Sequence, residues 1–285
     1  MTAFKAACIQ MRSGRDVEAN IATAERLVRA AAGAGASYAL TPEMTNLLER
    51  DRAALFTKIA CEADDPALKR LRALARELGI WLHIGSLAIR LGEETVANRG
   101  YLITPKGGIT ARYDKIHMFD VDLDNGESWR ESRTYQPGEI SPVVDLPWAK
   151  LGMAICYDVR FPQIFRGQAK AGAQVLTVPA AFTRQTGQAH WHVLLRSRAI
   201  ENGAYVIAAA QGGRHEDGRE TFGHSLIVAP WGEVIAEADH DEPGFILAEI
   251  DPGEVEKARA RIPAIANERA FTFETVASAQ TEPLS

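Results

Sequence analysis

The sequence has few cysteines, no excess of basic residues and no long apolar run. Its 285 residues include only three cysteines, at positions 8, 61 and 156. They form no paired framework, and free thiols suit a reducing cytosol. Basic residues number 32 against 37 acidic ones, so a net charge of -5 offers no basic surface to nucleic acid. No apolar stretch approaches the length of a transmembrane helix. These absences predict a cytoplasmic protein that binds neither nucleic acid nor membrane.

Motifs for leader peptides and nucleotide cofactors are also missing. The chain opens on a strand-like segment at 4–11, without the charged and apolar regions of a signal peptide. Gly33 and Gly35 lack the later glycine of a dinucleotide-binding turn, and no phosphate loop is present. With 46% hydrophobic and 24% charged residues, the composition is that of a globular protein. We therefore expect a folded protein without a nucleotide cofactor.

Strand-like and helix-like segments alternate along the chain without a linker. Apolar residues at helical spacing predict helices at 17–34 and 66–78, and further helices are expected after 161 and at 187–202. Strands are expected at 80–89, 99–104, 174–179, 205–211, 225–230, 234–238 and 245–250, and near residues 110, 143 and 151. This order favours a layered α/β architecture over a purely parallel sheet or a barrel. We predict one domain over residues 1–272 and a C-terminal tail at 273–285.

The stretch from Leu151 to Pro162 ends a buried strand on a cysteine at a sharp turn. Residues 151–155 form a short apolar run, and the residues after Cys156 indicate a turn into a helix. Amide groups at the start of that helix are expected to lower the pKa of the thiol. Cys156 is thus a candidate nucleophile. The alternative is a small core residue, which is what most free cysteines are.

A nucleophilic cysteine needs a general base and a donor for the developing oxyanion. Glu43 directly follows a strand-like run that breaks at Pro42. Lys115 stands at the end of a hairpin whose turn is residues 105–108. Each residue alone is typical of solvated surface. Together with Cys156, they make a candidate catalytic group.

The segments around Glu43, Lys115 and Cys156 resemble the Glu, Lys, Cys triad of the nitrilase superfamily, the carbon-nitrogen hydrolases. The resemblance continues through motifs at 179–183, 186–191, 195–201, 223–225 and 230–233, and covers about residues 4–252. It implies a four-layer α-β-β-α sandwich, no cofactor, and subunits that pair through helices into a homodimer or higher homo-oligomer. Helix 187–202 and the C-terminal segment are the candidates for that interface, with ordinary surface and core as the alternative.

The resemblance also implies roles for the conspicuous residues. Glu43 acts as general base with a pKa near working pH, and Lys115 stays cationic between two carboxylates. Lys115 and the backbone amide of Tyr157 stabilise the oxyanion while Cys156 forms a thioester. A second glutamate of the family is assigned to Glu131 rather than Glu127, because the spacing from Glu131 to the later Pro-Gly pair matches the family pattern.

Within the superfamily the chain resembles the Nit branch, whose members hydrolyse small carboxylated 2-oxo acid amides. The branch includes amidases of deaminated glutathione and of 2-oxoglutaramate, and residues 211–215 favour the former. Carboxylated substrates require arginines or hydroxyl groups in the pocket. The candidates by position are Tyr157, Arg160, Phe182, Thr183 and Arg184. For Arg160 the alternative is a structural ion pair near the turn.

Other functions stay open on the sequence alone. Within the enzyme class, a nitrilase or an N-carbamoyl amino acid amidohydrolase is the second choice. A protein that only associates with others is a different class, but such a protein has no chemical need for all four residues of the predicted catalytic group. His190 and His192 have the spacing of some zinc ligands. A third ligand is not evident, so no metal is expected.

Overall fold

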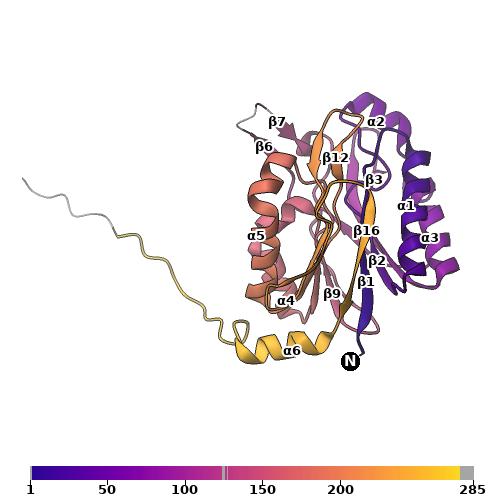
Figure 1. Cartoon of the computed structure of the whole chain (residues 1–285). Coiled ribbons are helices and arrows are strands. Elements are labelled where there is room, and N and C mark those ends of the chain that lie inside the picture. Colours follow the sequence, from indigo (N-terminus) through magenta and orange to yellow (C-terminus); the bar gives the residue numbers. More distant parts are fainter. Residues whose placement is uncertain (1, 124–125, 127, 277–285) are drawn as a thin grey trace, which may run out of the picture.

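The computed structural model describes residues 2–123, 126 and 128–276. Two six-stranded sheets pack face to face between two layers of helices (Figure 1). The first sheet has the strand order β16-β1-β2-β3-β4-β5 and the second the order β15-β14-β11-β10-β9-β8. Their bounds are β1 Phe4–Gln10, β2 Tyr38–Leu40, β3 Trp81–Arg90, β4 Val96–Ile103, β5 Ile109–Asp114, β8 Val143–Asp145, β9 Lys150–Met153, β10 Val175–Thr177, β11 Tyr205–Ala208, β14 Leu226–Val228, β15 Val234–Glu237 and β16 Gly244–Ile250.

Both sheets mix parallel and antiparallel pairs. In the first, β1, β2 and β3 run parallel, and β16, β4 and β5 add antiparallel neighbours. In the second, β9, β10 and β11 are parallel. Since parallel neighbours end on the same edge of a sheet, the segments after β9 and β10 emerge together. The segment after β2 of the first sheet meets them there, because Glu43 accepts a hydrogen bond from the Ala181 N–H. These are the segments that carry Glu43, Cys156 and Ala181.

Helices α1 (Val17–Gly33) and α3 (Pro66–Leu78) cover the first sheet, and α4 (Pro162–Lys170) and α5 (Arg184–Asn202) cover the second (Figure 1). Buried apolar side chains fill the space between the sheets, and a separate cluster fills the space between the first sheet and α1 and α3. This arrangement confirms the predicted four-layer α-β-β-α sandwich. Among the residues described, there is no helix with the length and apolar character needed to cross a membrane.

Helix α5 begins three residues earlier than its sequence predicts. The N–H of Gly187 donates to the carbonyl of Thr183 at 2.8 Å, so Gly187 lies inside the helix. A β-carbon at position 187 would lie 2.3 Å from Cβ of Phe222. The glycine therefore marks a close contact with β13 (Glu220–Phe222) and not the start of the helix.

Several elements are not predicted from the sequence, because each is too short or too polar to give a clear periodic signal. They are α2 (Arg52–Lys58), α6 (Pro252–Arg261), β6 (Asp120–Asp122), β7 (Ser128–Arg130), β12 (Gly212–Arg214), β13, and two 3-10 helices at Glu131–Arg133 and Cys156–Arg160. The chain after α6 leads away from the sandwich (Figure 1). The division into a domain at 1–272 and a tail at 273–285 stays a prediction, and residues 277–285 lie outside those described.

Glu49 ties two segments near the first sheet together and gives a test of stability against pH. Its carboxylate is buried and accepts from Arg15 at 2.7 Å and Lys58 at 2.9 Å. Burial alone would raise the pKa of Glu49, but hydrogen bonds from Arg15 and Lys58 lower it to about 2. A lowered pKa stabilises the fold above the unfolded value near 4.5, and this stabilisation is lost as pH falls toward 2.

We therefore expect Glu49→Gln to lower the urea midpoint of unfolding at pH 7, with a smaller difference from wild type at pH 3. Glu77 forms an exposed ion pair with Arg29, so Glu77→Gln is the matched control and should change the midpoint little. A difference for Glu49→Gln that grows toward pH 3 would contradict the assignment.

Candidate active site

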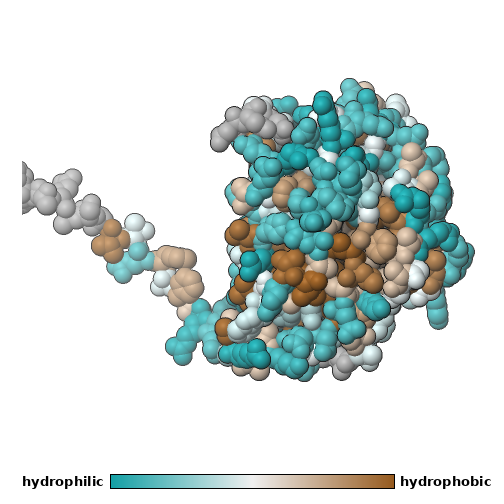
Figure 2. All heavy atoms as spheres, in the orientation of Figure 1, coloured by the Kyte–Doolittle hydropathy of each residue, from teal (hydrophilic) through white to brown (hydrophobic). Residues whose placement is uncertain are grey.

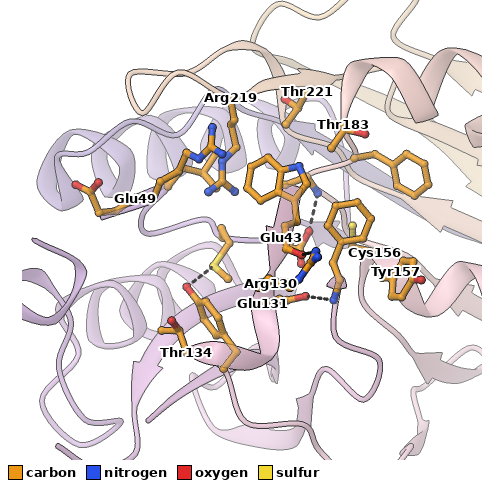
Figure 3. Close-up of a pocket in the computed structure, with 18 of the residues that line it drawn as sticks. Glu43, Glu49, Arg130, Glu131, Thr134, Cys156, Tyr157, Thr183, Arg219 and Thr221 are labelled. Carbon is orange, nitrogen blue, oxygen red and sulfur yellow. Dashed lines mark hydrogen bonds between the residues drawn. The ribbon is translucent and has the colours of Figure 1, made fainter. Parts of the chain in front are cut away.

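Cys156 lies on a sharp turn shortly after β9 ends at Met153. Its backbone has a φ of 49°, in the left-handed region that non-glycine residues rarely adopt. The Cys156 N–H donates to the carbonyl of Pro179 at 2.9 Å, and a 3-10 helix follows from Cys156 to Arg160. The predicted sharp turn is therefore present. It places the Cys156 side chain beside Glu43 (Figure 3).

Asp158 holds this turn against the end of β5. Its fully buried carboxylate accepts the Ile155 N–H at 2.8 Å and the Tyr113 hydroxyl at 2.6 Å. The other oxygen accepts the His117 N–H at 3.1 Å and lies 2.7 Å from His117 Nδ1. Tyr113 and His117 flank Lys115 in sequence. One carboxylate therefore fixes Cys156 relative to Lys115.

Glu43 approaches from the first sheet, where its segment crosses close to β3. A β-carbon at Gly85 would lie 2.0 Å from the carbonyl oxygen of Thr41, so only glycine permits this approach. The Glu43 carboxylate accepts the Ala181 N–H at 2.8 Å on Oε2 and the Asn98 amide at 2.8 Å on Oε1. These contacts aim the carboxylate at the Cys156 thiol, which donates a hydrogen bond to it.

Lys115 lies between two carboxylates. Its Nζ is 3.0 Å from Glu43 Oε1 and 2.8 Å from Glu131 Oε2. Glu131 is held in turn by the Phe119 N–H at 2.7 Å and by Asn98 at 3.1 Å. Burial opposes the charge on Lys115, but Glu131 and Glu43 outweigh it and raise its pKa well above the usual range. Lys115 is therefore cationic.

The proton of the Glu43 and Cys156 pair rests on sulfur. Burial and the neighbouring Glu43 carboxylate raise the pKa of the Cys156 thiol. Burial alone would also raise the pKa of Glu43, but Lys115 and the hydrogen bonds from Cys156, Lys115 and Asn98 hold it below its usual range. The predicted lowering of the Cys156 pKa by helix amides is thus wrong, because the sulfur is buried and a carboxylate adjoins it. The predicted Glu43 pKa near working pH is also wrong, because the pKa of this carboxyl lies below its usual range. The pair nevertheless has a base beside a thiol.

A cavity of about 510 Å³ opens onto these residues (Figure 3). Glu43, Lys115, Glu131 and Cys156 all line it, and so do the predicted substrate-binding residues Tyr157, Phe182 and Thr183. The structure therefore brings these seven side chains to one cavity.

Two predicted arginines lie elsewhere. Arg160 is not part of the cavity lining, since its guanidinium lies 5.2 Å from the Phe182 ring centre and 3.3 Å from His190 Nδ1. Arg184 also does not line the cavity, because it pairs with Asp241 and, at 3.3 Å, with Glu220. The expectation that these arginines reach the pocket is corrected.

His190 and His192 have different partners. His190 contacts Arg160, whereas Nε2 of His192 lies 2.8 Å from Glu237. Within the described ranges no group of three or more histidine, cysteine, aspartate or glutamate side chains is arranged to hold a metal ion. Glu127, the alternative to Glu131, lies outside the described residues.

Several residues of the site were missed from the sequence. Asn98 bridges Glu43 and Glu131 from the interior of β4, and nothing in its local sequence distinguishes it from an ordinary strand residue. Asp158 lies within the segment singled out for Cys156, so its acidic side chain at a buried turn was an available signal. Two of the cavity arginines, Arg50 and Arg219, come from loops with no recognisable motif.

Comparison with known proteins shows which protein family has this fold and site. The sequence model of the carbon-nitrogen hydrolase family matches residues 5–260. The chain is 39% identical over 267 residues to the deaminated glutathione amidase of Yersinia enterocolitica, covering 92% of each chain. It is 39% identical over 268 residues to the human deaminated glutathione amidase, covering 92% of this chain and 81% of that one.

Solved structures agree. The Caenorhabditis elegans NitFhit protein superposes with a TM-score of 0.88 at 36% identity, over 94% of this chain and 65% of that one. Saccharomyces cerevisiae Nit3, described as a member of branch 10 of the nitrilase superfamily, gives 0.82 at 28% identity, over 92% and 94%. The chain therefore belongs to the carbon-nitrogen hydrolase family. Within it, the chain is an amidase of the nitrilase superfamily.

The role of Asp158 can be tested by Asp158→Asn. The amide keeps the size of the side chain but cannot accept all four hydrogen bonds, and it loses the charge that strengthens them. We expect kcat to fall about 10- to 100-fold, since losing bonds to a charged group costs about 1.5–3 kcal/mol. Steady-state kinetics would measure kcat, and a urea titration would measure any change in stability. Asp145, an exposed residue of β8, provides the control Asp145→Asn. Wild-type kcat in Asp158→Asn would contradict the positioning role.

Proposed function

We propose that this protein is a cysteine-dependent amidase that hydrolyses deaminated glutathione through a thioester on Cys156. The observation that carries the proposal is the cavity, which joins a buried thiol, a carboxylate and a lysine to a wall rich in arginine. Glu43, Lys115, Cys156 and Glu131 are the proposed catalytic residues. Tyr157, Phe182 and Thr183 are proposed to contact the substrate.

Each step follows from the positions of the charges. The Cys156 sulfur attacks the amide carbonyl as its proton moves to Glu43, and the carbonyl electrons collect on an oxyanion that Lys115 and the Tyr157 N–H stabilise. Glu43 then gives the proton to the amide nitrogen, the C–N bond breaks, and the amine leaves. Water next attacks the thioester while Glu43 takes its proton. The C–S bond breaks, the acid leaves, and the proton returns to sulfur.

The charge of the cavity supports a carboxylated substrate. Its lining contains six basic side chains, Arg50, Arg52, Lys115, Arg130, Arg133 and Arg219, against four acidic ones, Glu43, Glu49, Glu131 and Glu220. The cavity thus has an excess of positive charge, although the chain as a whole has a net charge of -5. Arginine is suited to bind carboxylates bidentately.

The choice of deaminated glutathione rests on the relatives that carry this name at 39% identity. In this molecule a ketone replaces the amino group of glutathione, so it is a 2-oxo acid amide with a carboxylate at each end. The amide to be cleaved joins the 2-oxo acid to cysteinylglycine. Hydrolysis therefore gives 2-oxoglutarate and cysteinylglycine.

The test measures release of cysteinylglycine from deaminated glutathione and release of ammonia from 2-oxoglutaramate, side by side. We expect the larger kcat/KM for deaminated glutathione. A larger value for 2-oxoglutaramate would identify an ω-amidase instead. Turnover of neither, with turnover of a nitrile or an N-carbamoyl amino acid, would overturn the substrate assignment.

We also propose a cytoplasmic homodimer. All three cysteines are free, which supports a reducing compartment. Four large apolar side chains are exposed on α5, β15 and the turn before β15, namely Val193, Ile200, Trp231 and Ile235. Figure 2 shows apolar surface across the middle of the face that carries α5. A second copy of the chain would cover this surface, and light scattering of the purified protein would give the mass that decides it.

A further inference from the structure

Two arginines and a tryptophan from three separate parts of the chain meet in the cavity wall. Arg50 precedes α2, Trp129 lies on β7, and Arg219 lies in the turn between β12 and β13. The guanidinium carbon of Arg50 is 4.5 Å from the Trp129 ring centre, and that of Arg219 is 4.9 Å from it. All three residues line the same cavity as Cys156. We call them the arginine-tryptophan cluster.

The cluster places two positive charges against one aromatic ring. The ring attracts each cation, but the two guanidinium groups repel each other. Arg219 is nonetheless held firmly: its side chain is 17% exposed, and its Nε donates to Asp217 Oδ2 at 2.9 Å. Among the residues that the structure describes, Arg50 has no acidic partner. An anion that binds both groups would relieve their repulsion.

The cluster is also separate from the catalytic charges. Lys115 is held between two carboxylates, Glu43 and Glu131, whereas the two arginines of the cluster share one described carboxylate partner, Asp217. Figure 3 shows Arg219 on one side of the cavity, with Cys156 and Tyr157 on the other. A substrate that reacts at Cys156 therefore reaches the cluster only through a part remote from its carbonyl.

We propose that the arginine-tryptophan cluster binds the carboxylate carried by the amine half of the substrate, and so selects amides whose leaving group is an amino acid or a short peptide. The inference rests on the proposed function and deepens it. In deaminated glutathione, the amine half is the longer arm and ends in the glycine carboxylate. The cavity of about 510 Å³ is within the range of about 300–1,000 Å³ typical of drug-sized ligands, and is large for an amide that releases only ammonia.

Arg50→Gln and Arg219→Gln, made separately, test the cluster on two substrates. The readout is the ratio of kcat/KM for deaminated glutathione to kcat/KM for 2-oxoglutaramate, whose leaving group has no carboxylate. We expect each variant to lower this ratio about 10- to 100-fold, the loss typical of one or two charged hydrogen bonds, mainly through a higher KM. Arg214→Gln is the matched control, because Arg214 is exposed on β12 and does not line the cavity.

A second probe removes the carboxylate from the ligand. Deaminated glutathione with a carboxamide in place of the glycine carboxylate should have a kcat/KM about 10- to 100-fold lower on wild type, and should lose little more on Arg219→Gln. An unchanged ratio in both variants, or an equal loss on both amides, would overturn the cluster and leave the amidase proposal intact. Wild type that turns over 2-oxoglutaramate but not deaminated glutathione would overturn both. Melting temperatures within a few degrees of wild type exclude misfolding.

Discussion

Cys156→Ala should abolish amide hydrolysis while leaving the fold intact. The side chain that forms the thioester is removed, and the remaining groups can only polarise a bound amide. Loss of a covalent nucleophile costs on the order of 10⁴- to 10⁶-fold in kcat, so we expect turnover at or below the detection limit. The change is also small in volume, from a buried thiol to a methyl group. We therefore expect the free energy of unfolding, measured by urea titration, to change by less than about 1 kcal/mol.

Cys61→Ala is the matched control for this experiment. Cys61 is exposed and does not line the cavity, so the Cys61→Ala protein should keep full activity. Measurable turnover by Cys156→Ala would remove the thioester mechanism.

Lys115→Met should impair both activity and stability. Methionine fills a similar volume but leaves the buried carboxylates of Glu43 and Glu131 facing each other without a cation. Breaking a buried ion pair by removing one partner costs about 3–5 kcal/mol, and we expect that loss in the free energy of unfolding. We expect kcat to fall at least about 10³-fold, because the oxyanion loses its charged donor.

Two further variants separate the loss of stability from the loss of activity. Lys115→Arg keeps a positive charge, so it should recover most of the stability but little of the activity, since the guanidinium cannot occupy the position of Nζ. Lys150→Met is the control, because Lys150 is half exposed and pairs with the exposed Asp145 at 3.5 Å. Urea titration and steady-state kinetics on the three variants measure both quantities. A Lys115→Met protein as stable as wild type would contradict the charge balance described above.

Glu43, Lys115 and Cys156 could be singled out from the sequence because each lies shortly after a strand, where the backbone is determined by local sequence. Pro42 ends one run, the hairpin at 105–108 positions another, and an apolar strand delivers Cys156. The resemblance to a known family then supplied their roles. The order of helices and strands was predictable for the same reason, since it follows from apolar periodicity.

Side-chain direction could not be predicted, because residues distant in sequence determine it. Arg160 is only four positions from Cys156, yet Phe182 and His190 turn it out of the cavity lining. Asp158 meets Tyr113 across 45 positions of sequence. The direction of the Cys156 pKa shift could not be predicted for a similar reason. The local helix favours a thiolate, but burial and the Glu43 carboxylate, which comes from the other sheet, raise the pKa of the thiol.

The division of the site between two sheets has a consequence for the whole molecule. Glu43 and Lys115 belong to the first sheet, whereas Cys156 belongs to the second, and only their mutual alignment creates a reactive centre. A slip of one sheet past the other by the length of a hydrogen bond would separate base from thiol while both halves stayed folded. We therefore expect the catalytic rate to report on the alignment of the two sheets. In the proposed reaction, an acyl group bound to sulfur with its oxygen on Lys115 would also link the two sheets during each turnover.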